Sequence, residues 1–166
     1  MLRGKMSTPE DDEVWSILDR LIEMQPDRNN PDYPFGLNIP SADVYVLSSE
    51  HGRLMNGGLR YFFEFNPPGN MDYPSVAEVY RRIGAHNTAR SIIVAAEMFP
   101  FQDPHLKSDY RSQFMHEEEQ KLEELYRQTG EYRMLFEDLD SSIFDDEIDD
   151  KILAYMKSNL KLLPTR

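Results

Sequence analysis

The stretch that decides the fold is Met-Asn-Gly-Gly-Leu-Arg-Tyr-Phe-Phe-Glu-Phe-Asn-Pro-Pro-Gly, residues 55–69. Asn56, Gly57 and Gly58 form a cluster that interrupts regular structure, because glycine adopts a positive φ at little steric cost. The cluster predicts a tight turn in which one helix ends and another begins. A phosphate-binding loop would need a preceding strand and a Lys-Ser or Lys-Thr pair, and this stretch has neither.

The residues after the glycines predict a buried helix over residues 59–65. Leu59, Phe62 and Phe63 repeat at the spacing of one helical face. Two further aromatic residues widen this face, so we expect the helix to be buried on more than one side. Pro67 and Pro68 end it, because proline lacks an N–H group and disfavours a helical conformation in the residue before it.

A second motif follows the first and completes a family resemblance. Ile83-Gly84-Ala85 lies just before a hydrophobic helix. With Asn56-Gly57-Gly58 and its aromatic helix, this order of motifs resembles the acidic all-helical family that includes the Neisseria-type DNA-mimic protein. The resemblance covers residues 40–163. It implies an all-α fold, a tendency to form homodimers, and a surface that imitates duplex DNA and occupies a DNA-binding protein. It implies a structural role, and no catalytic role, for the three residues of the first motif and for Gly84.

The composition is that of one globular chain without cysteine. Of its 166 residues 40% are hydrophobic and 29% charged, which suffices for one hydrophobic core. The absence of cysteine excludes disulfides, thiolate metal sites and cysteine nucleophiles. No apolar stretch has the length of a membrane span, and no apolar signal region follows the first residues. We therefore expect a cytoplasmic protein that binds no membrane, with a flexible tail over residues 1–8 and a single all-α domain over residues 9–163.

Hydrophobic periodicity and helix breakers predict a bundle of about seven helices. Four prolines between residues 26 and 40 predict a long proline-rich loop after the first helix. We expect residues 131–144 to be irregular and Trp15 to lie in the core. The expected helices span residues 9–24, 41–55, 59–65, 73–83, 87–99, 108–128 and 145–163, with caps at Ser41 and at His86 or Asn87.

The acidic residues are concentrated in the C-terminal third. The formal charge is −12, from 30 acidic and 18 basic residues, and residues 117–150 hold 14 of the acids and three of the bases. This sign repels nucleic acid, so we expect no direct binding of DNA or RNA and a basic protein surface as the partner. The candidate partner-binding residues are Glu117, Glu118, Glu123, Glu124, Glu137, Asp138, Asp140, Asp145, Asp146 and Asp149.

Two interpretations of these acids stay open. Duplex DNA carries about one charge per 1.7 Å of its axis and a helix rises about 1.5 Å per residue, so a helix with many glutamates approaches the charge density of DNA. The alternative is a solvated helix face, together with acids that favour the N-terminus of the last helix.

No catalytic or metal-binding constellation is recognisable. Residues 138–149 imitate the spacing of a calcium loop, but Ile143 replaces the glycine of its sharp turn. The four histidines form no metalloprotease pair, and no serine lies in a nucleophile elbow. We therefore expect a non-catalytic binding protein without cofactor or metal, which by its resemblance is a DNA mimic. An immunity or antitoxin-type protein that neutralises a basic toxin domain stays open as an alternative, as does a hydrolase with an unrecognised site.

Overall fold

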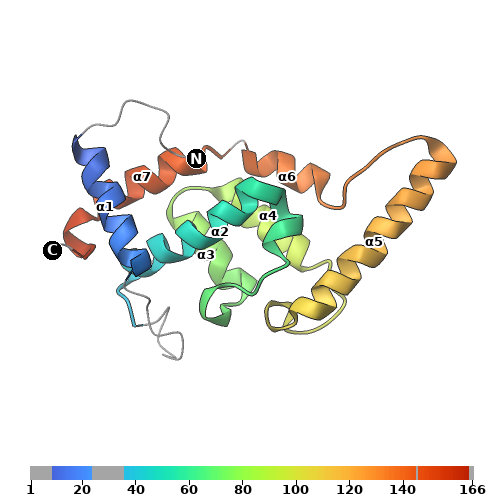
Figure 1. Ribbon diagram of the computed structural model, residues 1–166, viewed down its shortest axis with the longest axis horizontal. Helices are drawn as coiled ribbons and strands as arrows, with labels where there is room; N and C mark the ends of the chain where they lie inside the picture. Colours follow the sequence, from blue (N-terminus) through green and yellow to red (C-terminus); the bar gives the residue numbers. More distant parts are fainter. Residues whose placement is uncertain (1–8, 24–35, 145, 165–166) are drawn as a thin grey trace.

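The computed structural model describes residues 9–23, 36–144 and 146–164, and these residues form a helical bundle without strands (Figure 1). This confirms the predicted all-α, single-domain bundle. None of the described helices is both long and apolar enough to cross a membrane. The predicted tail, most of the predicted proline-rich loop and the side chain of Trp15 lie outside the described residues. The elements are α1 (Pro9–Glu23), α2 (Ile39–Phe62), η1 (Pro68–Asn70), α3 (Tyr73–Arg82), α4 (His86–Ala96), η2 (Pro104–Leu106), α5 (Ser108–Thr129), α6 (Glu137–Phe144), α7 (Ile148–Ser158) and η3 (Leu160–Leu162).

Helix α2 runs through the middle of the molecule and contacts α3 and α6, while α4 packs against α3 and α6 (Figure 1). Phe62, Phe63 and Tyr73 form an aromatic centre in this core, with ring centroids 4.9 to 5.9 Å apart. A second cluster of buried residues, which includes Val14 and Met156, lies where α1 and α7 meet the first half of α2. Leu59, Phe62 and Phe63 are buried, as their spacing predicts, but Tyr61 and Phe65 are 37% and 39% exposed. The expectation that this segment is buried on more than one side is therefore wrong.

Helix α2 consists of two helical segments that meet in a kink at Gly57 and Gly58. The predicted break between two helices is confirmed, because both residues leave the helical conformation: φ and ψ are −163° and 22° at Gly57, and 62° and −160° at Gly58. A Cβ atom on Gly57 would lie 2.6 Å from the Cβ atom of Tyr61, and one on Gly58 would lie 2.6 Å from Oδ2 of Asp140. Both positions thus exclude a side chain, the first by close approach and the second also by its positive φ.

Two helices begin with caps other than the predicted ones. Asn38 caps α2, since its side-chain oxygen accepts a hydrogen bond from the N–H group of Ser41 at 3.0 Å. Ser41 was the expected cap, and it lies inside the helix instead. Helix α4 is capped neither by His86 nor by Asn87. Its cap is the carboxylate of Asp146, which accepts a hydrogen bond from the N–H group of Thr88 although it lies 58 residues away along the chain.

The C-terminal part is more regular than expected over residues 131–144 and less regular after them. Helix α6 has only eight residues, and an isolated helix of that length is unstable in water. The buried side chains of Phe136 and Ile143 hold it against the main core, so tertiary packing decides its conformation. Helix α7 is shorter than the predicted 145–163, because it starts at Ile148 and gives way to η3 after Ser158.

Helix α5 extends away from the rest of the molecule (Figure 1). Its first part is anchored by Arg111, whose fully buried guanidinium donates to the backbone carbonyl oxygens of Phe63, Phe65 and Pro104. Beyond Met115 no residue of α5 is buried. We call residues 116–129 the arm and the described remainder of the helical bundle the body.

Candidate functional site

Three acidic side chains of the arm, Glu118, Glu123 and Glu124, pair with cations of the same helix. Lys121 donates to Glu118 at 2.5 Å, while Arg127 donates to Glu124 at 3.1 Å and to Glu123 at 3.5 Å. The hydrogen bond to Glu118 raises the pKa of Lys121. Because these pairs are exposed to solvent, they contribute little to stability and their carboxylates stay available to cations from outside.

Three candidate acids turn inward instead. Asp146 is buried and accepts hydrogen bonds from the N–H group and the hydroxyl of Thr88, at 2.6 and 2.8 Å. Asp149 lies 2.6 Å from Nε2 of His51 and so joins α7 to α2. Asp140 accepts a hydrogen bond from α2. Each of these carboxylates binds a group on α2 or α4 and holds helices together across the body, although the side chain of Asp149 stays 44% exposed. We therefore separate them from the acids that bind no distant helix.

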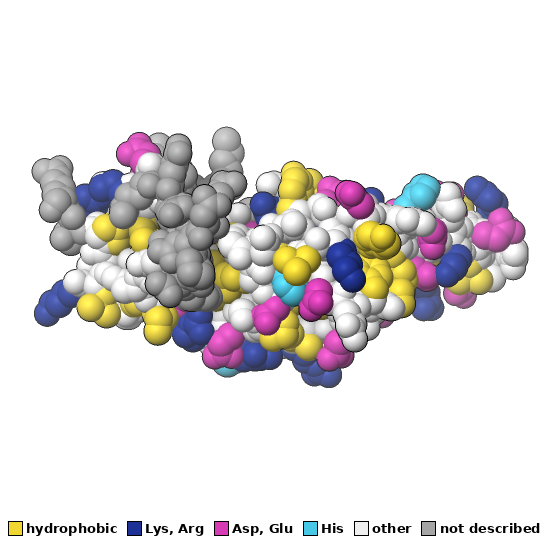
Figure 2. Space-filling view, turned by 90° about the horizontal axis from the view of Figure 1, so that it is seen from below, with side chains coloured by type: hydrophobic (Ala, Val, Ile, Leu, Met, Phe, Trp, Pro, Cys, Tyr) yellow, Lys and Arg dark blue, Asp and Glu magenta, His cyan; other side chains and the backbone are white. Residues whose placement is uncertain are grey.

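The remaining described candidates, which are exposed except for the half-buried Glu118, define a smaller set, which we call the acidic surface. Asp145 lies outside the described residues. Figure 2 shows one face of the molecule, on which acidic side chains are interspersed with basic and hydrophobic ones and do not form a uniform patch. The acidic surface consists of Glu117, Glu118, Glu123 and Glu124 on the arm and of Glu137 and Asp138 at the start of α6.

The described residues between 138 and 149 do not have the conformation of a calcium loop. Helix α6 carries the first positions of the calcium-like pattern, so their side chains do not converge. The carboxylates of Asp140, Asp146 and Asp149 serve three separate contacts on α2 and α4. Within the described residues, no group of three or more histidine and carboxylate side chains is placed to hold a metal ion.

Asp140 completes the bend of α2. The first N–H groups of a helical segment lack acceptors in their own helix, and the N–H group of Leu59 donates to Oδ1 of Asp140 at 2.8 Å. Burial raises the pKa of Asp140, and the hydrogen bond from Leu59 opposes this shift. Gly58 and Asp140 thus form one unit, since any side chain on Gly58 would occupy the space of the carboxylate. No local pattern around Asp140 signals this role.

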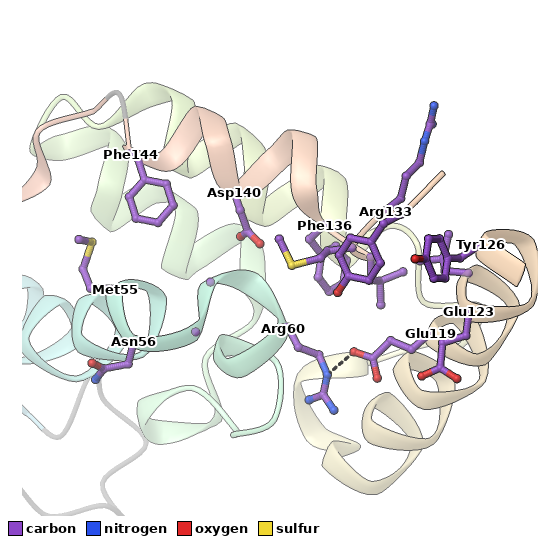
Figure 3. Close-up of a pocket in the computed structure, with 16 residues that line it drawn as sticks. Met55, Asn56, Arg60, Glu119, Glu123, Tyr126, Arg133, Phe136, Asp140 and Phe144 are labelled. Atoms are coloured by element: carbon purple, nitrogen blue, oxygen red, sulfur yellow. Dashed lines mark hydrogen bonds and ion pairs between the residues drawn. The ribbon is translucent and has the colours of Figure 1, made fainter. Parts of the chain in front are cut away.

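A cavity of about 580 Å³ opens between the bend of α2, the arm, α6 and the segment that joins α5 to α6 (Figure 3). We call it the kink groove. Its lining is mostly apolar and includes five large hydrophobic side chains that are exposed to solvent, Met55, Tyr126, Tyr132, Met134 and Phe144. Helical periodicity does not reveal this groove, although the aromatic residues interspersed among the acids are a signal for it.

An ion pair ties the arm to the body beside the kink groove. Nε of Arg60, on α2, donates to Oε1 of Glu119, on the arm, at 2.7 Å (dashed line in Figure 3). Arg60 also pairs with Glu64, two residues beyond the end of α2. The guanidinium of Arg60 is therefore engaged by two carboxylates and leaves the groove without an unpaired cation on this side.

A further ionisable group lies inside the body. Glu50 is fully buried, and Arg53 donates to its Oε1 atom at 2.7 Å. Its Oε2 atom and the hydroxyls of Tyr73 and Tyr80 are buried and have no hydrogen-bond partner within the described part of the chain. Burial raises the pKa of Glu50 to about 7, and Arg53 offsets only part of that effect. The protonation of Glu50 therefore changes near neutral pH.

One family model accounts for most of the chain. The model described as DMP19-like protein matches residues 36–159, which contain the bend of α2, the arm and the kink groove. No curated protein and no solved structure matches the chain. The match agrees with the resemblance carried by the motifs at residues 56–58 and 83–85. The chain therefore belongs to the DMP19-like protein family.

Proposed function

We propose that this protein is a non-catalytic binding protein that occupies a basic, DNA-binding protein, with its exposed carboxylates in the position of DNA phosphates. The observation that carries this proposal is the concentration of charge, since residues 117–150 hold 14 acids and only three bases. A basic protein surface is the complement of such a segment. The family resemblance supports the same function, because that family includes a DNA-mimic protein.

The arm makes its carboxylates accessible. A helix rises about 1.5 Å per residue, so Glu117 and Glu124 lie on one face about 10 Å apart, while Glu118 and Glu123 extend the charge to either side. DNA carries about one charge per 1.7 Å of its axis, which is a comparable density. The pairs with Lys121 do not prevent binding, because lysines and arginines of a partner can replace an exposed ion pair at little cost.

The test begins with identification of the partner and ends with competition. The purified protein captures binding proteins from an extract of its native host, and each captured protein is then bound to labelled DNA. Titration of this protein into that complex should release the DNA, as followed by fluorescence anisotropy. Release of DNA by this protein should weaken steeply between 0.1 and 1 M salt. The Debye length falls from ~10 to ~3 Å over this range, so the attraction between the carboxylates and the basic partner is screened.

Two matched variants show which acidic residues are needed for the release of DNA. Substitution of Glu117, Glu118, Glu123 and Glu124 by glutamine should weaken the release of DNA. The control neutralises four exposed acids of the body, Asp19, Glu23, Glu78 and Glu97, and should leave the release unchanged. Simultaneous binding of this protein and DNA to the partner, or release that is indifferent to salt, would contradict the proposal.

A further inference from the structure

The kink groove exposes several large hydrophobic side chains to solvent. Tyr132, Phe144 and Met134 are 70%, 60% and 56% exposed at its rim. Met55 and Tyr126 are each 47% exposed along its sides. Single exposed hydrophobic residues are common, but a contiguous group of this kind usually marks a binding surface on a soluble protein. The groove therefore has the surface character of a contact site.

The walls of the groove are held in place. The hydrogen bond between Asp140 and the Leu59 N–H group fixes α6 on the bend of α2. The ion pair between Arg60 and Glu119 holds the arm beside it, and Phe136 is buried at the base. A concave site that exists before binding costs less conformational entropy when it receives a ligand.

The charges around the groove favour a cation. Oδ2 of Asp140 accepts no hydrogen bond from the described residues, whereas its Oδ1 atom caps α2. Glu123 is exposed on the arm, with its cationic neighbour at 3.5 Å. Of the two arginines in the lining, Arg60 is paired with two carboxylates, and Arg133 points away from the cavity (Figure 3). An occupant with a lysine or arginine would meet carboxylate oxygens here.

These features select one kind of occupant. A second copy of this chain would bring the same excess of acids to the groove, and like charges oppose such a contact. A cationic amphipathic helix would supply both large apolar side chains and a positive charge, in the manner of a helix laid into a hydrophobic groove. The volume of about 580 Å³ lies within the 300 to 1,000 Å³ that is common for binding pockets.

We propose that the kink groove is the apolar anchor for the partner. It receives a short amphipathic helix whose large apolar side chains enter the groove, while a lysine or arginine one turn away meets Asp140 or Glu123. This inference rests on the proposed function, because it names the segment by which the same basic partner is held. The acidic surface accelerates the encounter, and the groove lengthens the lifetime of the complex.

Two model peptides and two matched variants test the inference. The probe is a fluorescein-labelled amphipathic helical peptide of leucine and lysine, and its counterpart carries glutamine in place of every leucine at the same charge. The groove variant combines Tyr132→Ser and Met134→Ser. The control variant combines Tyr110→Ser and Met98→Ser, which remove side chains that are also exposed, by 64% and 41%, but lie outside the groove.

The wild-type protein should bind the leucine peptide at least tenfold more tightly than the glutamine peptide, as measured by anisotropy. The groove variant should lose this preference and the control variant should keep it. Equal binding of both peptides to the wild-type protein would overturn the inference. So would an equal loss of preference in the two variants, because the effect would then belong to exposed hydrophobic residues in general.

The two proposals fail in different ways. A groove variant that still prefers the leucine peptide overturns the inference, even if neutralisation of the acidic surface abolishes release of DNA. Loss of that preference in the groove variant, with release of DNA unaffected by the neutralised acids, overturns the proposed function alone. Light scattering adds a third outcome: a wild-type homodimer that the groove variant converts to monomers would identify a second copy as the occupant and overturn the inference.

Discussion

The body and the arm use the same charged residue types for different purposes. In the body, Arg111 and Asp146 are buried and bind backbone groups of distant segments. In the arm, Glu123, Glu124 and Arg127 are exposed and bind only side chains of the same helix. A buried charge destabilises the fold unless it is fully paired, whereas an exposed charge costs almost nothing. Charge therefore determines the fold in the body and is available for recognition in the arm.

The sharpest test of this difference compares two arginines. Arg111→Ala should lower the free energy of unfolding by about 4 kcal/mol, because it leaves several buried carbonyl oxygens without a donor. Arg127→Ala removes a guanidinium of the same size from the arm and should leave the midpoint of urea unfolding unchanged. Equal losses in the two variants would show that the arm is as tightly integrated as the body.

The next effect concerns pH. Burial raises the pKa of Glu50 from its usual value of 4.5 to about 7 in the folded state. The folded protein thus binds this proton more tightly than the unfolded chain does. The resulting stabilisation of the folded state is complete below pH 4.5 and is lost as the pH rises through 7. The free energy of unfolding should fall by about 3 kcal/mol over this range.

The variant Glu50→Gln isolates that contribution. Urea unfolding across this pH window should show a steep loss of stability for the wild-type protein and a flatter profile for Glu50→Gln. Glu124→Gln, in the arm, serves as the control and should follow the wild-type profile. If the profiles of wild type and Glu50→Gln run parallel, the carboxyl group of Glu50 does not titrate in this range.

A smaller difference in stability is expected between alanine substitutions of two glycines in α2. Gly58→Ala should cost about 2 kcal/mol, because the position has a positive φ and the new Cβ atom would meet the carboxylate of Asp140. Gly52→Ala lies in the same helix with nothing within 4 Å of the new Cβ atom. It should stabilise the protein by about 0.5 to 1 kcal/mol, since alanine favours helix. Thermal unfolding measures both, and similar melting of the two variants would exclude the strained bend.

The smallest effect is expected in the arm. The combined substitution of Glu117, Glu118, Glu123 and Glu124 by glutamine should leave the melting temperature and the far-ultraviolet circular dichroism spectrum unchanged, because exposed ion pairs add little to stability. The same variant should lose binding to the partner. A large fall in its melting temperature would mean that these carboxylates support the fold after all.

Local signals in the sequence predicted the elements that depend on neighbours in the chain. Helices α3 and α5 agree closely with the predicted residues 73–83 and 108–128, because their ends are set by proline and glycine. The break at Gly57 and Gly58 was predicted correctly, because two adjacent glycines interrupt a helix through their own conformational freedom. Helix α6 was missed, since its eight residues become helical only through contacts with the main core.

At the candidate site, the number of acidic residues could be predicted from the sequence, but the direction in which each side chain points could not. The sequence shows many acids between residues 117 and 150, yet it does not distinguish Asp138, which is exposed, from Asp140, which caps α2. The partners of Asp140 and Asp146 lie 81 and 58 residues away, and no periodic pattern covers such distances. The kink groove was missed for the same reason, because four separate segments form its walls.

The hydrogen bond between Asp140 and Leu59 also bears on how the chain is made. Asp140 follows Leu59 by 81 residues, and ribosomes add about 5 to 20 residues per second, so roughly 4 to 16 s separate their synthesis. During that interval Phe62 and Phe63 have left the ribosome, but the carboxylate that caps their helical segment does not yet exist. The helical segment that carries Phe62 and Phe63 therefore lacks its capping acceptor for several seconds of synthesis, until Asp140 has been added.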